Sequence, residues 1–323
     1  MMLRTAFSLV SPAGPRAGLS ILIFHRVLPE PDPLLPEEVD AGRFDTLLDW
    51  IGDWFNILPL EEAIDRLRQG CLPARAAAIT FDDGYADNHD VALPILRRHG
   101  VSATFFIATG FLDGGRMFND TVIETVRRCA HSYFDLSMLG LGHYDLRSIE
   151  AKRLAIPALL GQIKYLPPVQ RVETVNAIAE IGNVTLSGDL MMTARQVKAL
   201  RAAGMGIGAH TVNHPILARL ESDAAKREIA ASRDHLQSLL GEPVTLFAYP
   251  NGKPDTDYRS EHVQMAHHLG FKAAVSTAWG VARCDSDPLQ LPRFTPWESQ
   301  RWRFVLNMMR NYSGPRKSDR SLS

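Results

Sequence analysis

The stretch AAAITFDDGY, residues 76–85, joins a short apolar run to two adjacent carboxylates and a glycine. Its first six residues are continuous and almost entirely apolar, which is typical of a strand buried in a parallel sheet. Runs of the same kind lie at residues 19–24 and 102–108. Between them, residues 44–55 and 60–69 place their apolar side chains at helical spacing. This alternation predicts strand–helix units, which build a parallel sheet with helices outside it.

The second half of the chain repeats the alternation. Thr193 followed by Gln196 predicts a capping box at the start of a helix. Further strands and helices are expected, in chain order, at residues 205–209, 222–240, 244–248, 258–269 and 271–275. This many strand–helix units favours an α/β fold with a closed or nearly closed barrel.

One stretch breaks the rhythm. Residues 111–190 contain no convincing strand, whereas residues 120–130 and 151–164 carry helical patterns. We therefore expect a single domain over residues 1–323 with a packed helical insertion, which lies beside the barrel mouth and shapes a cleft. A dimerisation element placed elsewhere on the molecule is the alternative. The polar tail at 313–323 is expected to be flexible.

The composition excludes several classes of protein. Hydrophobic residues make up 46% of the 323 residues and charged residues 22%, as in a soluble globular protein. The formal net charge of −1 gives no field that attracts nucleic acid or an acidic membrane. No apolar run reaches the roughly 18 residues of a transmembrane helix, and the apolar patch within residues 1–18 is short for a signal peptide. We expect a loose N-terminal arm and a cytoplasmic protein, and no feature predicts its oligomeric state.

Polar side chains follow several of the predicted strands directly. In a parallel α/β barrel the functional site lies where strands end and helices begin. The residues at these ends are His25, Asp82, Asp83, His210, Tyr249, Asn251, Trp279 and Arg293. Any one position says little by itself, but strands far apart in the chain deliver useful groups to the same rim. The pattern therefore predicts a functional site at this rim.

Asp82 and Asp83 form the acidic part of the predicted site. Two adjacent carboxylates at a buried strand end repel each other and lose hydration, and a bound cation is the usual compensation. An Asx-turn, with Gly84 at positive φ, is an alternative interpretation. His210 and His214 lie four residues apart, a spacing that places two imidazoles on one face of a helical turn. With 11 histidines in the chain, such a pair also arises by chance.

Taken together, these groups indicate a catalytic metal. Two histidines and one carboxylate leave coordination positions open, whereas structural zinc sites are usually closed by four ligands. Water held by such an ion loses a proton near neutral pH and becomes a nucleophile. The pattern therefore predicts metal-assisted hydrolysis.

Three motifs resemble those of a known family. TFDDGY (80–85), HTVNH (210–214) and FAYPNG (247–252) are similar to the first three signature motifs of the polysaccharide deacetylases, the NodB-homology group or carbohydrate esterase family 4. The resemblance covers residues 19–110 and 191–295. It implies a distorted (β/α) barrel of about seven parallel strands. It also implies one divalent ion, for which Zn²⁺ is expected and Co²⁺ and Ni²⁺ are alternatives.

The resemblance implies roles for individual residues as well. Asp82 would be the catalytic base. The metal ligands would be Asp83, His210 and His214. On the substrate side the resemblance implies Asn251 and Trp279, and we also assign Tyr249 and Arg293 there from their positions at strand ends. In that group the Asn251 N–H would help to hold the oxyanion, and Trp279 would form part of an acetyl pocket.

Two positions depart from the family pattern. Ala248 stands where many members have an arginine that tethers the base, and Arg293 stands where they have a histidine acid. Arginine cannot donate a proton near neutral pH, since its pKa exceeds about 12. Arg293 is expected to pair with Asp82 or Asp83, or to bind a substrate hydroxyl.

His25 ends the first predicted strand in the sequence Phe-His-Arg. This resembles a histidine found near the start of exopolysaccharide and poly-N-acetylglucosamine deacetylases, the branch in which the resemblance places this chain. His25 would protonate the leaving amine or orient Asp82. A buried histidine with a purely structural role is the alternative.

The predicted function is metal-dependent removal of acetyl groups from N-acetylated sugars of a bacterial polysaccharide or its precursor. The alternatives are hydrolysis of another amide such as a cyclic ureide, hydrolysis of an O-acetyl ester, and a catalytically silent carbohydrate-binding protein. An ester leaves with less help from a general acid, whereas binding alone does not need the base Asp82. Outside the site, Asp120 is interpreted as the start or cap of a helix and not as a residue of the rim.

Overall fold

The computed structural model describes residues 2–296 and 298–312, apart from the side chains of residues 2 and 3. Within these residues one sheet of seven parallel strands forms the centre of the molecule, in the order β1-β3-β4-β7-β8-β9 with β2 also beside β3. The strands are β1 (Leu19–Phe24), β2 (Asn56–Ile57), β3 (Ala76–Phe81), β4 (Thr104–Ile107), β7 (Gly206–Ala209), β8 (Leu246–Ala248) and β9 (Ala273–Val275). All six residues of β3 are buried, as its apolar sequence predicts.

The sheet curls so that its two edges are joined by one late segment. Leu291 forms a parallel bridge with Val275 at the end of β9, and Phe294 forms one with Leu22 of β1. The Phe294 N–H donates to the Ile21 carbonyl at 2.7 Å, and its carbonyl accepts from the Ile23 N–H at 3.0 Å. The expected distorted (β/α) barrel is confirmed, with an irregular segment at 291–294 where a regular strand would close it.

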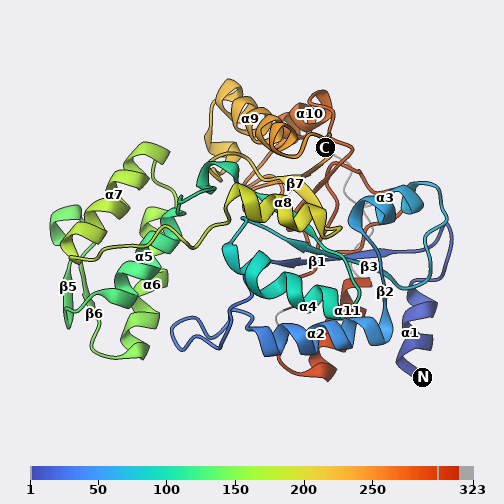
Figure 1. Cartoon of the computed structure of the whole chain (residues 1–323), viewed down its shortest axis with the longest axis horizontal. Helices are drawn as coiled ribbons and strands as arrows, with labels where there is room; N and C mark the ends of the chain where they lie inside the picture. The colour runs from blue at the N-terminus through green and yellow to red at the C-terminus, as the bar shows by residue number, and fades with distance from the viewer. Residues whose placement is uncertain (1, 297, 313–323) are drawn as a thin grey trace.

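Helices cover the outside of the curled sheet (Figure 1). The helices of the barrel are α2 (Ala41–Trp54), α3 (Leu60–Arg68), α4 (Leu93–Arg98), α8 (Ala194–Ala202), α9 (Ser222–Leu240), α10 (Ser260–His268) and α11 (Arg301–Tyr312). The predicted capping box is confirmed, because the Thr193 and Gln196 side chains bond each other's backbone N–H groups. Between sheet and helices lies an aromatic core in which the rings of Phe81 and Phe105 stack at 4.8 Å.

The insertion forms a lobe of its own at one side of the barrel (Figure 1). Its helices are α5 (Phe118–Arg128), α6 (Ile149–Ile163) and α7 (Pro168–Ile181). The expectation of no strand was wrong, because β5 (Tyr133–Asp135) and β6 (His143–Asp145) pair antiparallel. Each strand has only three residues and β5 buries only Phe134, so neither is long enough to show a period of two.

The N-terminus also differs from the expectation of a loose arm. Residues Met2–Val10 form the helix α1, and Phe7 is fully buried against Trp54, Phe55 and Tyr312. One anchoring side chain in nine residues gives almost no periodic signal, which explains the error. The predicted tail at 313–323 lies outside the described residues. No described helix is both long and apolar enough to cross a bilayer.

Candidate active site

Asp82 and Asp83 follow β3 at the rim of the barrel. The backbone turns sharply there, because Asp83 has a φ of 77° and Gly84 a φ of 90°. Both values lie in the left-handed region, which a glycine adopts without strain and an aspartate tolerates. The turn directs the two adjacent carboxylates toward different partners while it keeps both at the same rim. In a regular extended strand, neighbouring side chains would point to opposite faces of the sheet.

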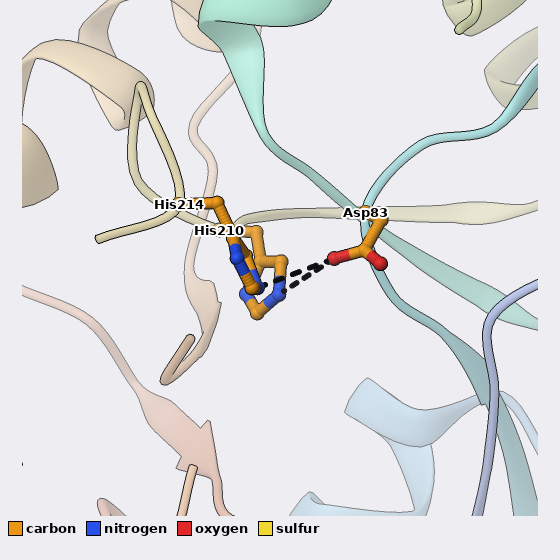
Figure 2. Close-up of side chains that lie close together, drawn as sticks. All are labelled: Asp83, His210 and His214. Atoms are coloured by element: carbon orange, nitrogen blue, oxygen red, sulfur yellow. Dashed lines mark ion pairs between the residues drawn. The ribbon is translucent and has the colours of Figure 1, made fainter. Parts of the chain in front are cut away.

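Asp83 faces two imidazoles from another strand end (Figure 2). Its Oδ1 atom lies 3.4 Å from Nε2 of His210 and 3.3 Å from Nε2 of His214. Asp83 and His210 are buried, and His214 is largely so. The three ligand atoms lie within 4.8 Å of one another, as the predicted metal site requires.

The hydrogen bonds of this cluster leave its inward-facing atoms available to a ligand. Nδ1 of His210 lies 2.7 Å from the Ala248 carbonyl, so Nδ1 carries a proton and, in the neutral ring, Nε2 is an acceptor. Burial alone would lower the pKa of His210, but the charges of Asp82 and Asp83 raise it, whereas burial lowers the pKa of His214 to about 4. Asp83 Oδ1 is buried and has no hydrogen-bond partner. Two imidazole nitrogens and a carboxylate oxygen that converge in this way fit a bound cation, which would take the place of a proton on His210.

Asp83 remains ionised although it is buried. Burial alone would raise the pKa of Asp83, but the adjacent His214 and His210 hold that pKa well below its usual range. The carboxylate is therefore ionised and available as a ligand.

The loop that carries the histidines is not the helical turn that their spacing suggested. Thr211 and His214 have φ values of 63° and 50°, and residues 210–214 belong to no helix. The loop is held from outside by Glu228 of α9, whose carboxylate accepts from the N–H groups of Val212 and Asn213 at 2.9 and 2.8 Å. The convergence of the two rings was predicted, but no pattern in the sequence pointed to Glu228.

Asp82 is held by Arg293, and this pairing was one of the predicted alternatives. Nη1 and Nη2 of Arg293 each donate to one oxygen of Asp82 at 2.7 Å. Arg293 is only 1% exposed, so it tethers the carboxylate and does not reach a substrate hydroxyl. Burial alone would raise the pKa of Asp82, but the charges of Arg293 and His210 bring that pKa below its usual range.

Of the other predicted residues, three remain candidates for the site and one has a buried side chain. His25 is half-buried, and its charge acts on both aspartates, which places it in the same electrostatic neighbourhood. Asn251 has a φ of 57° in the loop after β8. Trp279 is 57% exposed and stacks on Phe294 beside the rim. The assignment of the Tyr249 side chain to the substrate was wrong, because it is fully buried and its hydroxyl donates to the Leu289 carbonyl at 3.0 Å.

Sequence reasoning missed a buried polar network beside the aspartates. The hydroxyl of Tyr85 lies 3.2 Å from both carboxylate oxygens of Asp120. The guanidinium of Arg26 covers the Tyr85 ring at 4.7 Å and pairs with Asp87 at 2.8 Å. Asp120 lies in the first turn of α5, so the interpretation as a helix start is confirmed, although the N-cap is Met117. The residue is also 3% exposed, and burial raises its pKa to about 7. Its position at a helix start hid its place in this network.

A curled parallel sheet with carboxylates and imidazoles converging at its rim places this protein among the α/β barrels that carry their functional site at the strand ends. The family model of polysaccharide deacetylase matches residues 69–156 and 174–274. These segments make up more than half of the chain, so the protein belongs to the polysaccharide deacetylase family. This membership supports the general activity of the family, which is hydrolytic deacetylation of polysaccharide.

Individual relatives agree with this assignment. YxkH of Bacillus subtilis (strain 168), which bears the name of a polysaccharide deacetylase, is 23% identical over 279 residues, which cover 86% of this chain and 71% of YxkH. The deacetylase PplD of Streptococcus pyogenes, solved in complex with acetate, has a TM-score of 0.60 at 22% identity. The match covers 92% of this chain and 98% of the PplD chain. IcaB of Ammonifex degensii has a TM-score of 0.60 at 19% identity, with coverages of 91% and 96%. At these identities the solved structures support the fold.

Proposed function

We propose that this protein is a metal-dependent deacetylase of N-acetylated sugars in a bacterial polysaccharide or its precursor. One observation carries the proposal. Three atoms that can ligate a metal, from Asp83, His210 and His214, converge within 4.8 Å of one another. Beside them lies a second carboxylate, Asp82, which is fixed by a buried arginine. A cation site next to an oriented base is what hydrolysis of an amide by water requires.

Asp83, His210 and His214 would hold the metal, and Zn²⁺ suits their oxygen and nitrogen donors. When bound, such an ion makes water more acidic and polarises a carbonyl group. The second ring nitrogen of His210 is already committed to the Ala248 carbonyl at 2.7 Å, which fixes the direction of its other nitrogen. The chain therefore supplies a preorganised ligand set.

Asp82 is the group that takes the proton from the attacking water. The bidentate contact with Arg293 fixes the plane of the carboxylate and keeps it ionised, so it is ready to accept a proton at neutral pH. The contact also lowers the basicity of Asp82. Arg293 thus gives the base its orientation at the expense of some driving force for proton transfer.

The oxyanion and the acetyl methyl group need partners on the opposite side. The backbone N–H of Asn251 is the candidate donor to the oxyanion. Asn251 lies in the loop after β8 in a left-handed conformation, which reorients its peptide N–H. Trp279, exposed on the rim, is the candidate for contact with the acetyl group. His25 is the candidate for protonating the amine or for orienting Asp82.

The substitution Asp82→Asn tests the proposal. It keeps the size of the side chain but removes the base, so release of acetate from acetylated amino sugars should fall at least about 10²-fold. The metal content, measured by atomic emission, should stay at one ion per chain. His210→Ala is the matched variant that should lose the metal. Near-normal turnover by Asp82→Asn, or equal metal content in His210→Ala and the parent protein, would contradict the proposal.

A further inference from the structure

A cavity separates the insertion from the barrel next to the histidine loop. Its volume is about 820 Å³, within the range of small-molecule sites. One wall comes from α5 and α7 of the insertion, and the other from α9 and residues 212–215 of the loop. Val212, Asn213 and Pro215, which flank His214 on both sides, all line the cavity. The cavity therefore adjoins the proposed metal site without including its ligands.

Arg171 of α7 brings a poorly compensated positive charge to this cavity. The residue is 8% exposed, and its Nε–H is buried with no hydrogen-bond partner. Nη1 donates to the Lys164 carbonyl at 3.3 Å, and the guanidinium lies over the Phe118 ring at 4.5 Å. Within the described part of the chain no carboxylate pairs with it, and burial lowers its pKa. A buried charge that no carboxylate neutralises is costly unless a ligand supplies one.

The other charged residues of the lining balance one another. Arg116 and Arg227 are two cations, against the acids Glu173 and Glu228. The Glu228 carboxylate is occupied by N–H groups of the histidine loop, and Arg116 donates to a hydroxyl and a backbone carbonyl. Together with Arg171 the lining therefore carries three cations against two acids, a net positive charge that favours an anion.

The rest of the lining is apolar. Its hydrophobic members are Phe111, Phe118, Val169, Val172, Val175 and Leu220. Val169 and Val172 are 72% and 53% exposed, so they add accessible apolar surface to this wall. Water alone would be a poor occupant of such a surface, and a bare phosphate would leave the valines uncovered. The charge and the apolar wall together suit one molecule that has both an anionic and an apolar part.

We propose that the cavity binds an amphiphilic anion, a phosphate group that carries a hydrocarbon chain, with the phosphate at Arg171 and the chain along Val169 and Val172. Because the cavity borders the His214 loop, a sugar attached to that phosphate would reach the proposed metal site. The natural substrate would then be a lipid-linked acetylated sugar. That last step rests on the proposed function, whereas binding of the amphiphile does not.

Binding is tested by calorimetry on the full-length, metal-loaded protein with decyl phosphate, inorganic phosphate and the neutral decyl glucoside, all below their micelle concentrations. Decyl phosphate should bind at least tenfold more tightly than either of the other two. Arg171→Gln should weaken it at least tenfold, and Val172→Asp, an exposed substitution that repels the anion, should do the same. Arg195→Gln, at an exposed position of α8 outside the cavity, is the matched control and should change nothing.

Two results would overturn the amphiphile site. One is unchanged affinity for decyl phosphate in both Arg171→Gln and Val172→Asp, and the other is equal affinity for decyl phosphate and inorganic phosphate. The variant His210→Ala separates this site from direct binding of phosphate to the metal, because it should keep its affinity for decyl phosphate. Loss of binding in that variant would assign the phosphate to the metal instead.

Turnover tests the link to catalysis. The ratio of kcat/KM for N-acetylglucosamine joined through phosphate to a decyl chain over that for its methyl glycoside should exceed ten. Arg171→Gln should abolish this preference, whereas Arg195→Gln should keep it. A preference that survives in Arg171→Gln would refute the substrate assignment. If the parent protein deacetylated neither sugar, the proposed function would fail, and calorimetry would still decide the amphiphile site.

Discussion

Asp82 and Asp83 are neighbours in the chain but have different environments. The left-handed turn at Asp83 directs this side chain to the two imidazoles, whereas Asp82 meets a guanidinium. Arginine supplies a fixed positive charge to the base, and the histidines supply neutral nitrogen donors. Two adjacent residues are therefore suited to different tasks. Asp82 is suited to accept a proton, and Asp83 is suited to hold a metal.

Arg293→Gln should be strongly destabilising, because it leaves Asp82 buried without its cation. Breaking a buried pair in this way typically costs about 3–5 kcal/mol, and the free energy of unfolding measured in urea should fall by that order. The pKa of Asp82 should rise, since the largest charge that opposes the effect of burial is then lost. The acid limb of the pH–rate profile should move to higher pH.

Arg293→Lys is the matched control for charge. It keeps the positive charge but loses the two parallel hydrogen bonds. The acid limb should stay closer to that of the parent protein, while kcat falls because the carboxylate is less well oriented. An acid limb at the same pH in Arg293→Gln and the parent protein would show that this pair does not control the base.

His25→Ala should retain the metal and lose turnover. Two roles for the imidazole are distinguished by His25→Gln, which can hydrogen-bond but cannot titrate near neutral pH. If His25 is the acid, both variants lose the alkaline limb of the pH–rate profile. If it orients Asp82, His25→Gln recovers part of the activity. Turnover within twofold of the parent protein in His25→Ala would remove the residue from the mechanism.

At the scale of elements, α5 contacts the barrel rim through a buried acid. The side chain of Asp120 reaches from the first turn of α5 to the Tyr85 hydroxyl, two residues beyond the proposed metal ligand Asp83. Burial raises the pKa of Asp120 from its ordinary value of 3.8 to about 7. The lobe is therefore attached to the site by a contact whose protonation changes within the physiological range.

The stability of the protein should depend on pH through this contact. Between about pH 4 and pH 7 the folded chain holds a proton on Asp120 that the unfolded chain has released. The free energy of unfolding should therefore fall as the pH rises, by at most about 1.36 kcal/mol per unit. Asp120→Asn removes this slope, so its stability relative to the parent protein should improve from pH 5 to pH 7.

Urea unfolding of both proteins in the presence of a chelator measures the effect without a contribution from metal binding. Asp223→Asn, at an exposed position in the first turn of α9, is the matched control and should run parallel to the parent protein. If Asp120→Asn ran parallel as well, Asp120 would be shown to titrate like a solvated acid.

The elements that sequence predicted well are those whose signal is local. The bounds of β1 and β3 follow from unbroken apolar runs, and the capping box follows from two side chains three residues apart. The short β5 and the helix α1 were missed, because each buries one or two side chains and shows no period. Whether an element could be predicted from the sequence depended on the length of its repeating pattern more than on its residue types.

At the scale of the whole molecule, the site was only partly predictable. The two aspartates and two histidines are contiguous motifs, so their convergence at one rim follows from barrel geometry. The partner of Asp82 lies 211 residues away in the chain, and sequence alone left open whether Arg293 binds an aspartate or a substrate. The support of the loop by Glu228 depends on how α9 packs, which no local pattern encodes.

Removing the metal should lower the stability of the whole fold. An ion that binds only the folded chain stabilises it by about 2.7 kcal/mol when its free concentration is 100 times its Kd. A chelator should therefore lower the melting temperature of the parent protein, and added Zn²⁺ should restore it. His214→Ala should melt at the same temperature with and without chelator. A parent protein equally insensitive to chelator would contradict the proposed ligand set.

The bridge formed by residues 291–294 has a consequence for biosynthesis. A ribosome makes the chain from its N-terminus, so Asp82 emerges long before the guanidinium that orients it. While the nascent chain still lacks residues 291–294, neither Leu22 nor Val275 has its bridging partner. The base and the edges of the sheet therefore acquire their partners together, near the end of synthesis.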